Sequence, residues 1–426
     1  MGPLLIVTLV ITMLMGVPVG MCLAITAMVG MLFVSPDLLI MLPQKFISGL
    51  DSFPLLAIPL FVLAGQLMAQ GGLAKRIVEL SLVFVGRIRG GLGLVVIFST
   101  MLMSGISGSP AANTAAIGSI AVPAMKKQKY PVGFSTALLA AAGGVSTLVP
   151  PAIDLIIIGV IANISISALF AAGILPAILC GSAIMILANR KARKLELPLI
   201  EPMTKSEKRE TLKDGLLPLL MVFIILGGIY GGVFTPTEAA AVAVVYGFCV
   251  SFFIYKELKL RDLPDVLLKT CALTGVVLLV LASAAMFSFL LTFEGIPLEM
   301  ADMITKYAFN WIVFILFVHI LFFVLGMVMD CLPPILILMP ILVPVANAMG
   351  IDPVHFGIIV AANVGLGMVS PPVGICLFVA CGLSDTPIEK VVKPLLPFLL
   401  VLTISLMVIT FVPQISLFLP RLLGLS

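Results

Sequence analysis

Two acidic residues interrupt apolar runs of the sequence, and each lies close to a pair of prolines. Asp330 comes just before Cys331-Leu332-Pro333-Pro334, and Asp154 follows Pro150-Pro151. An acid at the depth of a lipid bilayer is costly and is usually kept for a function. We therefore expect Asp330 to contact a solute or an ion. Asp154 falls where a helix would restart after the prolines, so a site contact and a capping role are both open.

Composition makes a lipid bilayer the natural surrounding of these acids. Of the 426 residues, 61% are hydrophobic and only 10% are charged, with a mean hydropathy of +1.28. A soluble domain of this length would expose most of that apolar surface to water. The basic residues gather in short loops, which excludes the broad basic face of a nucleic-acid-binding protein. The seven cysteines have no metal-ligand spacing, and we expect small buried hydrophobes.

The apolar runs predict membrane-spanning helices, each of which needs about 20 apolar residues. Continuous candidates cover 4–33, 54–70, 168–189, 214–234, 237–255, 265–292 and 394–419. Two further runs, 131–166 and 355–384, are broken at their centres by Pro150-Pro151 and Pro371-Pro372. Irregular backbone at membrane depth must be buried in protein or line a cavity. The two broken helices therefore predict a polar site between them.

Two further polar residues lie within apolar runs. We expect Glu238 to cap a helix. We expect His319 to be a hydrogen-bonded core residue, and a role as a proton relay is the alternative for it.

Two more stretches, 91–125 and 310–346, are predicted to be re-entrant hairpins with tips at Ser104–Pro110 and Gly326–Pro334. The limbs of the first are about 13–15 residues long, too short to cross a core of about 30 Å. Both of its ends carry basic residues, which places both on the cytoplasmic side, whereas the second hairpin has few and fits the opposite side. The basic residues flanking the first hairpin are Arg87, Arg89, Lys126, Lys127 and Lys129.

The two hairpins and their broken helices align with each other at an offset of about 221 residues. Gly105–Ser109 matches Gly326–Asp330, and Pro150-Pro151 matches Pro371-Pro372. Because the hairpins open to opposite sides, the repeats are inverted, which is typical of transporters with a site at the bilayer midplane.

The expected fold is therefore an all-α integral membrane protein built from an inverted repeat, with two re-entrant hairpins and two broken helices. Segments 72–90 and 295–308 mix charged and apolar residues and are expected to be amphipathic arms at the membrane surface. The expected division of the chain is 1–90 (scaffold helices and first arm), 91–166 (hairpin 1 and its broken helix), 167–308 (scaffold helices, cytoplasmic basic loop and second arm), 309–385 (hairpin 2 and its broken helix) and 386–426 (C-terminal helix).

Several of these motifs resemble the large membrane subunit of TRAP (tripartite ATP-independent periplasmic) transporters, of the DctM type. The resemblance covers the whole chain and is strongest in Ser104–Ile120, Met339–Ala346, Gly350–Gly357 and Ser370–Gly374. It implies a multi-pass protein of the bacterial inner membrane that works as an elevator driven by sodium. It also implies three further components: a separate small four-helix membrane subunit, a periplasmic binding protein, and an organic acid substrate of the sialic acid or C4-dicarboxylate class. Pro110 and Ser370 depart from the family pattern.

In such a transporter the coupling ion would be Na⁺, two or more of them, held by main-chain oxygens of the tips and of the breaks. A plain tight turn is the alternative for each of these residues. The expected ligands are Ser104, Ser107, Gly144, Thr147 and Val149 in the first repeat and Gly326, Met329, Gly365 and Met368 in the second.

The substrate anion would be held by the N-termini of half-helices, whose free N–H groups and dipole attract negative charge. Polar side chains near these ends would add contacts, and hydrogen bonds between helices are the alternative role for them. The expected substrate-binding residues are Ser109, Asn113, Thr114, Asp154, Asp330 and Asn363.

Two other functions are compatible with the sequence. A proton-coupled antiporter for small ions would use Asp330 as its titrating acid. An intramembrane enzyme would need Asp154 and Asp330 as an acid pair, and the sequence has no zinc-protease His-Glu-x-x-His motif.

Overall fold

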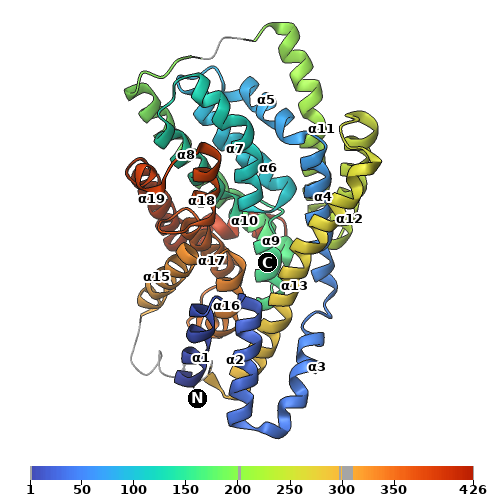
Figure 1. The fold of residues 1–426 in the computed structure, drawn as a ribbon, viewed down its shortest axis with the longest axis vertical. Coiled ribbons are helices and arrows are strands. Elements are labelled where there is room, and N and C mark those ends of the chain that lie inside the picture. Colours follow the sequence, from blue (N-terminus) through green and yellow to red (C-terminus); the bar gives the residue numbers. More distant parts are fainter. Residues whose placement is uncertain (1, 200–202, 297–298, 300–309, 426) are drawn as a thin grey trace.

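The computed structural model describes residues 2–199, 203–296, 299 and 310–425 (Figure 1). These residues form helices joined by loops, and none of them lies in a β-strand. Among these described residues, eight helical segments are long and apolar enough to cross a membrane. They are Phe53–Gln70, Val132–Ala162, Ile166–Lys194, Lys205–Tyr230, Pro236–Ile254, Leu260–Phe293, Trp311–Val328 and Ile388–Phe411. The expectation of an all-helical membrane protein is thus confirmed.

The first apolar run is two helices rather than the single span predicted for 4–33. Helix α1 (Gly2–Leu14) ends near Gly16, which has a φ of +77°, and α2 (Val19–Val34) begins directly after Pro18. The two helices pack against each other. The hydropathy of the sequence does not reveal this break, because the glycine and the proline that form the turn are surrounded by apolar residues.

The repeat predicted from the sequence is seen in the order of the helices, because five consecutive helices of the first repeat each have a counterpart in the second. Helices α6, α7, α8, α9 and α10 are each followed, roughly 220 residues later, by a helix of similar position in the second repeat. The pairs are α6 (Gly91–Ser107) with α15 (Trp311–Val328), α7 (Pro110–Lys127) with α16 (Leu332–Ala348), α8 (Val132–Val145) with α17 (Pro353–Gly367), α9 (Ile153–Ala162) with α18 (Ile375–Ser384), and α10 (Ile166–Lys194) with α19 (Ile388–Phe411). Helices α6 and α7 lie in the upper half of Figure 1, and α15 and α16 in the lower half.

Both proline pairs interrupt a helix, as predicted. Helix α8 passes into the short 3-10 turn η3 (Ser146–Leu148), and α9 restarts after Ala152. In the second repeat α17 ends at Gly367 and α18 starts at Ile375. Each interruption leaves peptide groups without helical partners in the interior of the molecule, so other segments must supply those partners.

The two broken helices cross where their main chains touch. A Cβ atom added to Gly365 would lie 2.3 Å from the Gly144 carbonyl oxygen and 2.5 Å from Thr147 Oγ1. A Cβ atom on Gly144 would lie 2.6 Å from the Gly365 carbonyl oxygen. Glycine is therefore required at both positions, which correspond to each other in the repeat.

The two repeats also interlock through their half-helices. Helix α18 of the second repeat packs against α7 and α8 of the first, while α9 of the first packs against α16 and α17 of the second. At the C-terminal end of α18, Lys126 Nζ donates to the Ser384 carbonyl oxygen at 2.8 Å, and Thr136 Oγ1 donates to Ser384 Oγ at 2.8 Å. We call α6–α9 and α15–α18 together the interlocked unit.

The remaining helices surround this unit. Helices α4 (Ala57–Gln70), α11 (Lys205–Tyr230), α12 (Pro236–Cys249) and α13 (Leu263–Phe293) lie at one side of it in Figure 1, and α3 (Met41–Ser48) lies below α4. The expected cap at Glu238 is confirmed, because the Glu238 N–H donates to Thr235 Oγ1 at 3.3 Å and the Thr235 N–H donates to Glu238 Oε2 at 2.8 Å. We call α4 and α13 the wall helices, because they face the interlocked unit across the cavity described below.

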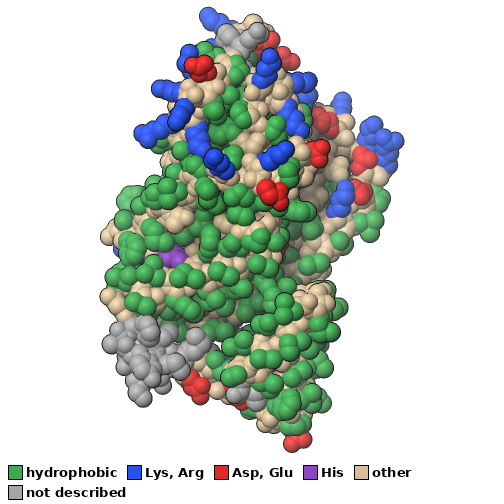
Figure 2. Space-filling model, turned by 60° about the vertical axis from the view of Figure 1, so that its left-hand side comes forward, with side chains coloured by type: hydrophobic (Ala, Val, Ile, Leu, Met, Phe, Trp, Pro, Cys, Tyr) green, Lys and Arg blue, Asp and Glu red, His purple; other side chains and the backbone are tan. Residues whose placement is uncertain are grey.

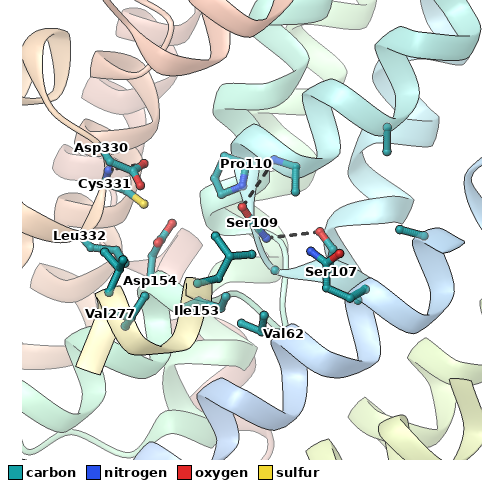
Figure 3. Close-up of a pocket in the computed structure, with 18 of the residues that line it drawn as sticks. Val62, Ser107, Ser109, Pro110, Ile153, Asp154, Val277, Asp330, Cys331 and Leu332 are labelled. Carbon is teal, nitrogen blue, oxygen red and sulfur yellow. Dashed lines mark hydrogen bonds between the residues drawn. The ribbon is translucent and has the colours of Figure 1, made fainter. Parts of the chain in front are cut away.

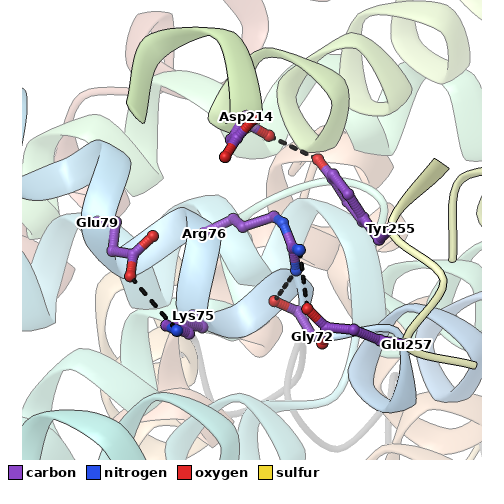
Figure 4. A network of polar contacts seen from close by, with 7 residues as sticks. All are labelled: Gly72, Lys75, Arg76, Glu79, Asp214, Tyr255 and Glu257. Carbon is purple, nitrogen blue, oxygen red and sulfur yellow. Dashed lines mark hydrogen bonds and ion pairs between the residues drawn. The ribbon is translucent and has the colours of Figure 1, made fainter. Parts of the chain in front are cut away.

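The predicted first arm is the helix α5 (Leu73–Val85), which is fastened to its neighbours at its start. Arg76 donates to the Gly72 carbonyl oxygen at 3.0 Å, pairs with Glu257 at 2.8 Å and lies over the Tyr255 ring, 3.6 Å from its centre (Figure 4). Tyr255 in turn donates to the Asp214 carbonyl oxygen at 2.5 Å. The predicted second arm, 295–308, lies largely outside the described residues.

The C-terminal segment is also two helices, where one was predicted. Helix α19 ends at Phe411 and α20 (Gln414–Leu422) begins after Pro413.

Lysine and arginine side chains gather at the upper end of the molecule in Figure 2, and the broad middle is covered by hydrophobic side chains. This distribution fits a membrane protein with one basic, cytoplasm-facing end.

We predict that Gly365→Ala lowers the apparent melting temperature of the purified protein, with a loss of stability of about 1–3 kcal/mol, since its methyl group would collide with the Gly144 carbonyl. Gly382→Ala is the matched control, because nothing lies within 4 Å of a Cβ added there. The control should be neutral or slightly stabilising. Equal melting temperatures for Gly365→Ala and the wild type would contradict the tight crossing.

Candidate functional site

A cavity of about 220 Å³ lies where both hairpin tips meet the wall helices (Figure 3). This is smaller than the range of roughly 300–1,000 Å³ that is usual for drug-sized ligands, and it suits a small solute. One side is formed by the tips and by the start of α9, and the other by α4 and α13. The lining residues are Val62, Gly65, Gln66, Ala69, Met103, Ser107, Gly108, Ser109, Pro110, Ala112, Ala116, Ile153, Asp154, Leu273, Val276, Val277, Asp330, Cys331 and Leu332.

The first tip is shorter than predicted, because α6 continues as a helix through Ser107. The helix ends at Gly108, which has a φ of +64° and whose N–H donates to the Ser104 carbonyl oxygen at 3.0 Å. Glycine in this conformation is the usual residue after a helix C-terminus. Ser109 then caps α7, its hydroxyl accepting from the Ala112 N–H at 3.5 Å. The unwound part is thus Gly108-Ser109 rather than the whole of Ser104–Pro110.

The second tip is the short link between α15 and α16. Met329 is extended, and the Asp330 carboxylate accepts from the Cys331 N–H at 2.8 Å. In Figure 3 the Cys331 thiol lies between the carboxyl groups of Asp330 and Asp154. The structure therefore brings together the two acids that are far apart in the sequence, one from each repeat.

Asp154 lies in the first turn of α9 and is only 1% exposed. Ala152 occupies the position that caps this helix, so the structure does not support a capping role for Asp154. Within the described part of the chain, Asp154 Oδ2 has no hydrogen-bond partner. A buried carboxylate oxygen without a partner is costly, so Asp154 is a candidate for binding a ligand or a proton.

In each repeat, the end of the first hairpin helix accepts hydrogen bonds from main-chain groups that the neighbouring break leaves free. The Ile153 N–H donates to the Gly108 carbonyl oxygen at 3.3 Å in the first repeat. In the second repeat, the Val373 and Gly374 N–H groups donate to the Met327 carbonyl oxygen at 3.3 and 3.0 Å. The same contact recurs in both repeats, so the pairing of tip and half-helix is a feature of the fold.

The expected sodium ligands of the first repeat lie around its break. Ser104 Oγ donates to the Ser146 carbonyl oxygen at 2.7 Å, Thr147 Oγ1 donates to the Gly144 carbonyl oxygen at 3.2 Å, and the Val149 N–H donates to the Ser146 carbonyl oxygen at 3.3 Å. Ser107 Oγ donates to Asn113 Oδ1 at 2.5 Å. These groups form a cluster of main-chain and hydroxyl oxygens, the kind of ligand that a hard cation prefers.

In the second repeat Gly326 packs against Gly367, with an added Cβ only 3.0 Å from Gly367 Cα. The Met368 carbonyl oxygen, one of the expected ion ligands, already accepts from the Cys376 and Leu377 N–H groups at 3.0 and 3.4 Å. Among the described residues, no group of three or more His, Cys, Asp or Glu side chains is placed to hold a metal. A cation here would therefore depend on main-chain and hydroxyl oxygens.

Three expected substrate-binding residues do not line the cavity. Thr114 donates to the Pro110 carbonyl oxygen at 2.8 Å. Asn363 is fully buried, with Oδ1 2.9 Å from His319 Nδ1 and Nδ2 donating to the Ile359 carbonyl oxygen at 2.8 Å. Asn113 contacts Ser107, which does line the cavity, and its Nδ2 is buried without a partner in the described structure.

Asn363 and His319 thus form part of the hydrogen-bonded core, together with Thr410, whose Oγ1 lies 3.2 Å from His319 Nε2. The expectation of a core histidine is confirmed, and Asn363 takes the interhelical role that was its alternative.

Two side chains with polar groups, Gln66 and Cys331, line the cavity but were not among the predicted site residues. Cys331 directly follows Asp330, and Gln66 is an amide inside the apolar run of α4. The signal for Gln66 was present in the sequence, because a polar side chain within a spanning helix is expected to face protein or a cavity.

Comparison with known proteins agrees with this architecture. Residues 6–415 match the family model described as "Tripartite ATP-independent periplasmic transporter, DctM component". The chain is 38% identical to the C4-dicarboxylate TRAP transporter large permease protein of Pseudomonas aeruginosa, covering 95% of each chain. It is 37% identical to the sialic acid TRAP transporter large permease protein of Vibrio cholerae, covering 96% of this chain and 95% of the relative.

A solved structure with a similar fold is that of the Alcanivorax borkumensis YdaH transporter. The TM-score is 0.66 at 17% identity, and the match covers 92% of this chain and 90% of that one. At 17% identity, this similarity is evidence for a shared fold.

We predict that Asp154→Asn leaves the apparent melting temperature unchanged or raises it, because the neutral amide removes a buried charge that has no counter-charge. Asp352→Ala should act in the opposite direction. Asp352 caps α17 by accepting from the Val354 and His355 N–H groups, so its loss should cost about 1 kcal/mol. A clear drop for Asp154→Asn would show that the carboxylate is stabilised where it lies.

Proposed function

Because this chain belongs to the DctM family of tripartite ATP-independent periplasmic transporters, we propose that it is the membrane subunit that moves an organic acid across the bacterial inner membrane with sodium ions. The family match and the eight candidate spans establish a multi-pass transport protein. Sodium coupling, substrate and mechanism are the content of the proposal.

The observation that carries the proposal is the placement of the cavity. Its lining comes from both repeats of the interlocked unit and from the wall helices. A site between two repeats, built at broken helices, is the arrangement used by many secondary transporters. A solute in this cavity would contact both the interlocked unit and the wall helices. Its binding would therefore be coupled to the position of the unit relative to the wall helices.

The charge of the cavity favours co-transport of a cation. Among the described residues, no Lys, Arg or His lines the cavity, whereas Asp154 and Asp330 both do. Two like unit charges 4 Å apart repel by about 4 kcal/mol at an effective dielectric constant of 20. An organic anion would add to this repulsion, and bound sodium ions would offset it. The oxygen clusters at the two breaks are the proposed sodium sites.

The movement we propose is an elevator. The interlocked unit is held together by close main-chain crossings and by hydrogen bonds between repeats, such as those to Ser384. The wall helices face it mainly with apolar or small residues, namely Val62, Gly65, Ala69, Leu273, Val276 and Val277. A surface with few polar contacts can slide at low cost. Re-entrant hairpins and the arm α5 would let the unit move while the scaffold stays fixed.

The proposed substrate is an organic acid, in keeping with relatives that carry C4-dicarboxylates or sialic acid. As in the tripartite family, it would be delivered by a periplasmic binding protein, and a small membrane subunit would complete the complex.

A proton-coupled transporter is the second candidate. It is favoured by one observation, the meeting of Asp154 and Asp330 in one cavity, where a shared proton would relieve their repulsion.

We predict that proteoliposomes holding the complex take up labelled organic acid only with an inward sodium gradient and with binding protein outside. The expected result is loss of uptake when choline replaces sodium, because none of the described cavity residues has a basic side chain to balance the substrate. Uptake that persists in choline and follows a pH gradient, and that Asp330→Asn abolishes, would favour proton coupling and contradict sodium coupling.

A further inference from the structure

The wall side of the cavity is formed by one face of each wall helix. Val62, Gly65, Gln66 and Ala69 have the spacing of one helical face on α4. Leu273, Val276 and Val277 do the same on α13. Gln66 is the single polar side chain on this wall among the described lining residues, so a polar solute would meet it there.

Gln66 also differs in chemistry from every other polar side chain of the cavity. Asp154 and Asp330 are acceptors when ionised, and Ser107 already donates to Asn113. The Ser109 hydroxyl accepts from the Ala112 N–H at the start of α7. Among the described residues that line the cavity, Gln66 has the only side-chain N–H groups.

The neighbouring glycine brings Gln66 close to the first tip. A Cβ atom on Gly65 would lie 3.0 Å from Ser107 Cα and 3.1 Å from Ser107 Cβ. The main chain of α4 therefore touches the end of α6, one residue before Gly108. A larger residue at 65 would hold the wall away from the tip and widen the distance between Gln66 and the substrate side of the cavity.

We infer that Gln66 donates a hydrogen bond from the wall to a carboxylate or hydroxyl oxygen of the bound organic acid, and so acts as a determinant of substrate affinity. This inference rests on the proposed function. An amide can supply this donor without placing a charge on an apolar helix face in the membrane. Because α4 belongs to the wall rather than to the interlocked unit, the contact exists only while the cavity faces this part of the wall.

Movement of the unit would then break the contact and weaken substrate binding. Gln66 thereby differs from Ser109, Asp154 and Asp330, which lie on the interlocked unit and would travel with the substrate. The affinity should be higher in the arrangement seen here than after the unit has moved.

The test compares three variants of the full complex with the wild type, using succinate and N-acetylneuraminate as probes. Gln66→Leu keeps the size and removes the donor, and Gln66→Glu puts a third carboxylate into the cavity. Gln70→Leu is the matched control, because Gln70 lies one turn further along α4, is exposed and does not line the cavity. Uptake into proteoliposomes shows which of the two probes the wild type transports. Titration of that probe into the purified complex in the presence of sodium then gives its dissociation constant.

For the probe that the wild type takes up, Gln66→Leu should raise the dissociation constant about tenfold, the low end for a hydrogen bond to a charged group. Gln66→Glu should raise it further, and Gln70→Leu should leave it unchanged. The sodium concentration for half-maximal stabilisation without substrate should be the same in the wild type, Gln66→Leu and Gln70→Leu, whereas a general structural defect would change it. Wild-type affinity in Gln66→Leu would overturn the inference while uptake by the wild type still supports the proposed function. Failure of the wild type to take up either probe would instead overturn the proposed function for these substrate classes, and the inference with it.

Discussion

The contact of two main chains at Gly144 and Gly365 is the constraint on which the rest of the structure depends. Helices α8 and α17 can approach this closely only because neither residue has a side chain. Both helices are interrupted directly after the crossing, so free peptide groups accumulate in the interior. The hairpin tips supply the missing partners, with Gly108 receiving the Ile153 N–H and Met327 receiving the Val373 and Gly374 N–H groups. The polar centre of an apolar protein is thus built largely from main chain.

The same constraint explains why the cavity lies where it does. The tips must reach the breaks, and in doing so they bring Asp330 of one repeat beside Asp154 of the other (Figure 3). The half-helices cross from each repeat into the other, so the two tips are fixed relative to each other. The wall side of the cavity is different, since Gln66 is the one polar side chain among the described wall residues that line it. The transport mechanism that we propose depends on this difference: the two repeats are tightly joined to each other, whereas the wall helices face them mainly with apolar or small residues.

Much of this architecture could be predicted from the sequence, because proline pairs and glycine-rich tips have few other meanings in an apolar chain. The repeat, both broken helices and the cap at Glu238 were predicted in this way. The breaks at Pro18 and Pro413 were missed, since the surrounding hydropathy does not change there. The extent of the first tip was overestimated, because burial lets Ser104 through Ser107 remain helical until Gly108. The sequence did not predict that Asn363 would hydrogen-bond to His319, because this contact depends on how distant helices pack.

The central claim is that the interlocked unit moves as one body along the wall. Spin labels on exposed positions, with the exposed Cys249 and Cys271 replaced, would test it by electron–electron distance measurements. One pair, Ser119 on α7 and Phe378 on α18, lies within the unit, and the other, Ser119 and Val245, joins the unit to α12. Adding sodium and substrate should shift the Ser119–Val245 distance distribution and leave the Ser119–Phe378 distribution unchanged. A change confined to the Ser119–Phe378 pair would contradict the account, because the two repeats would then move against each other.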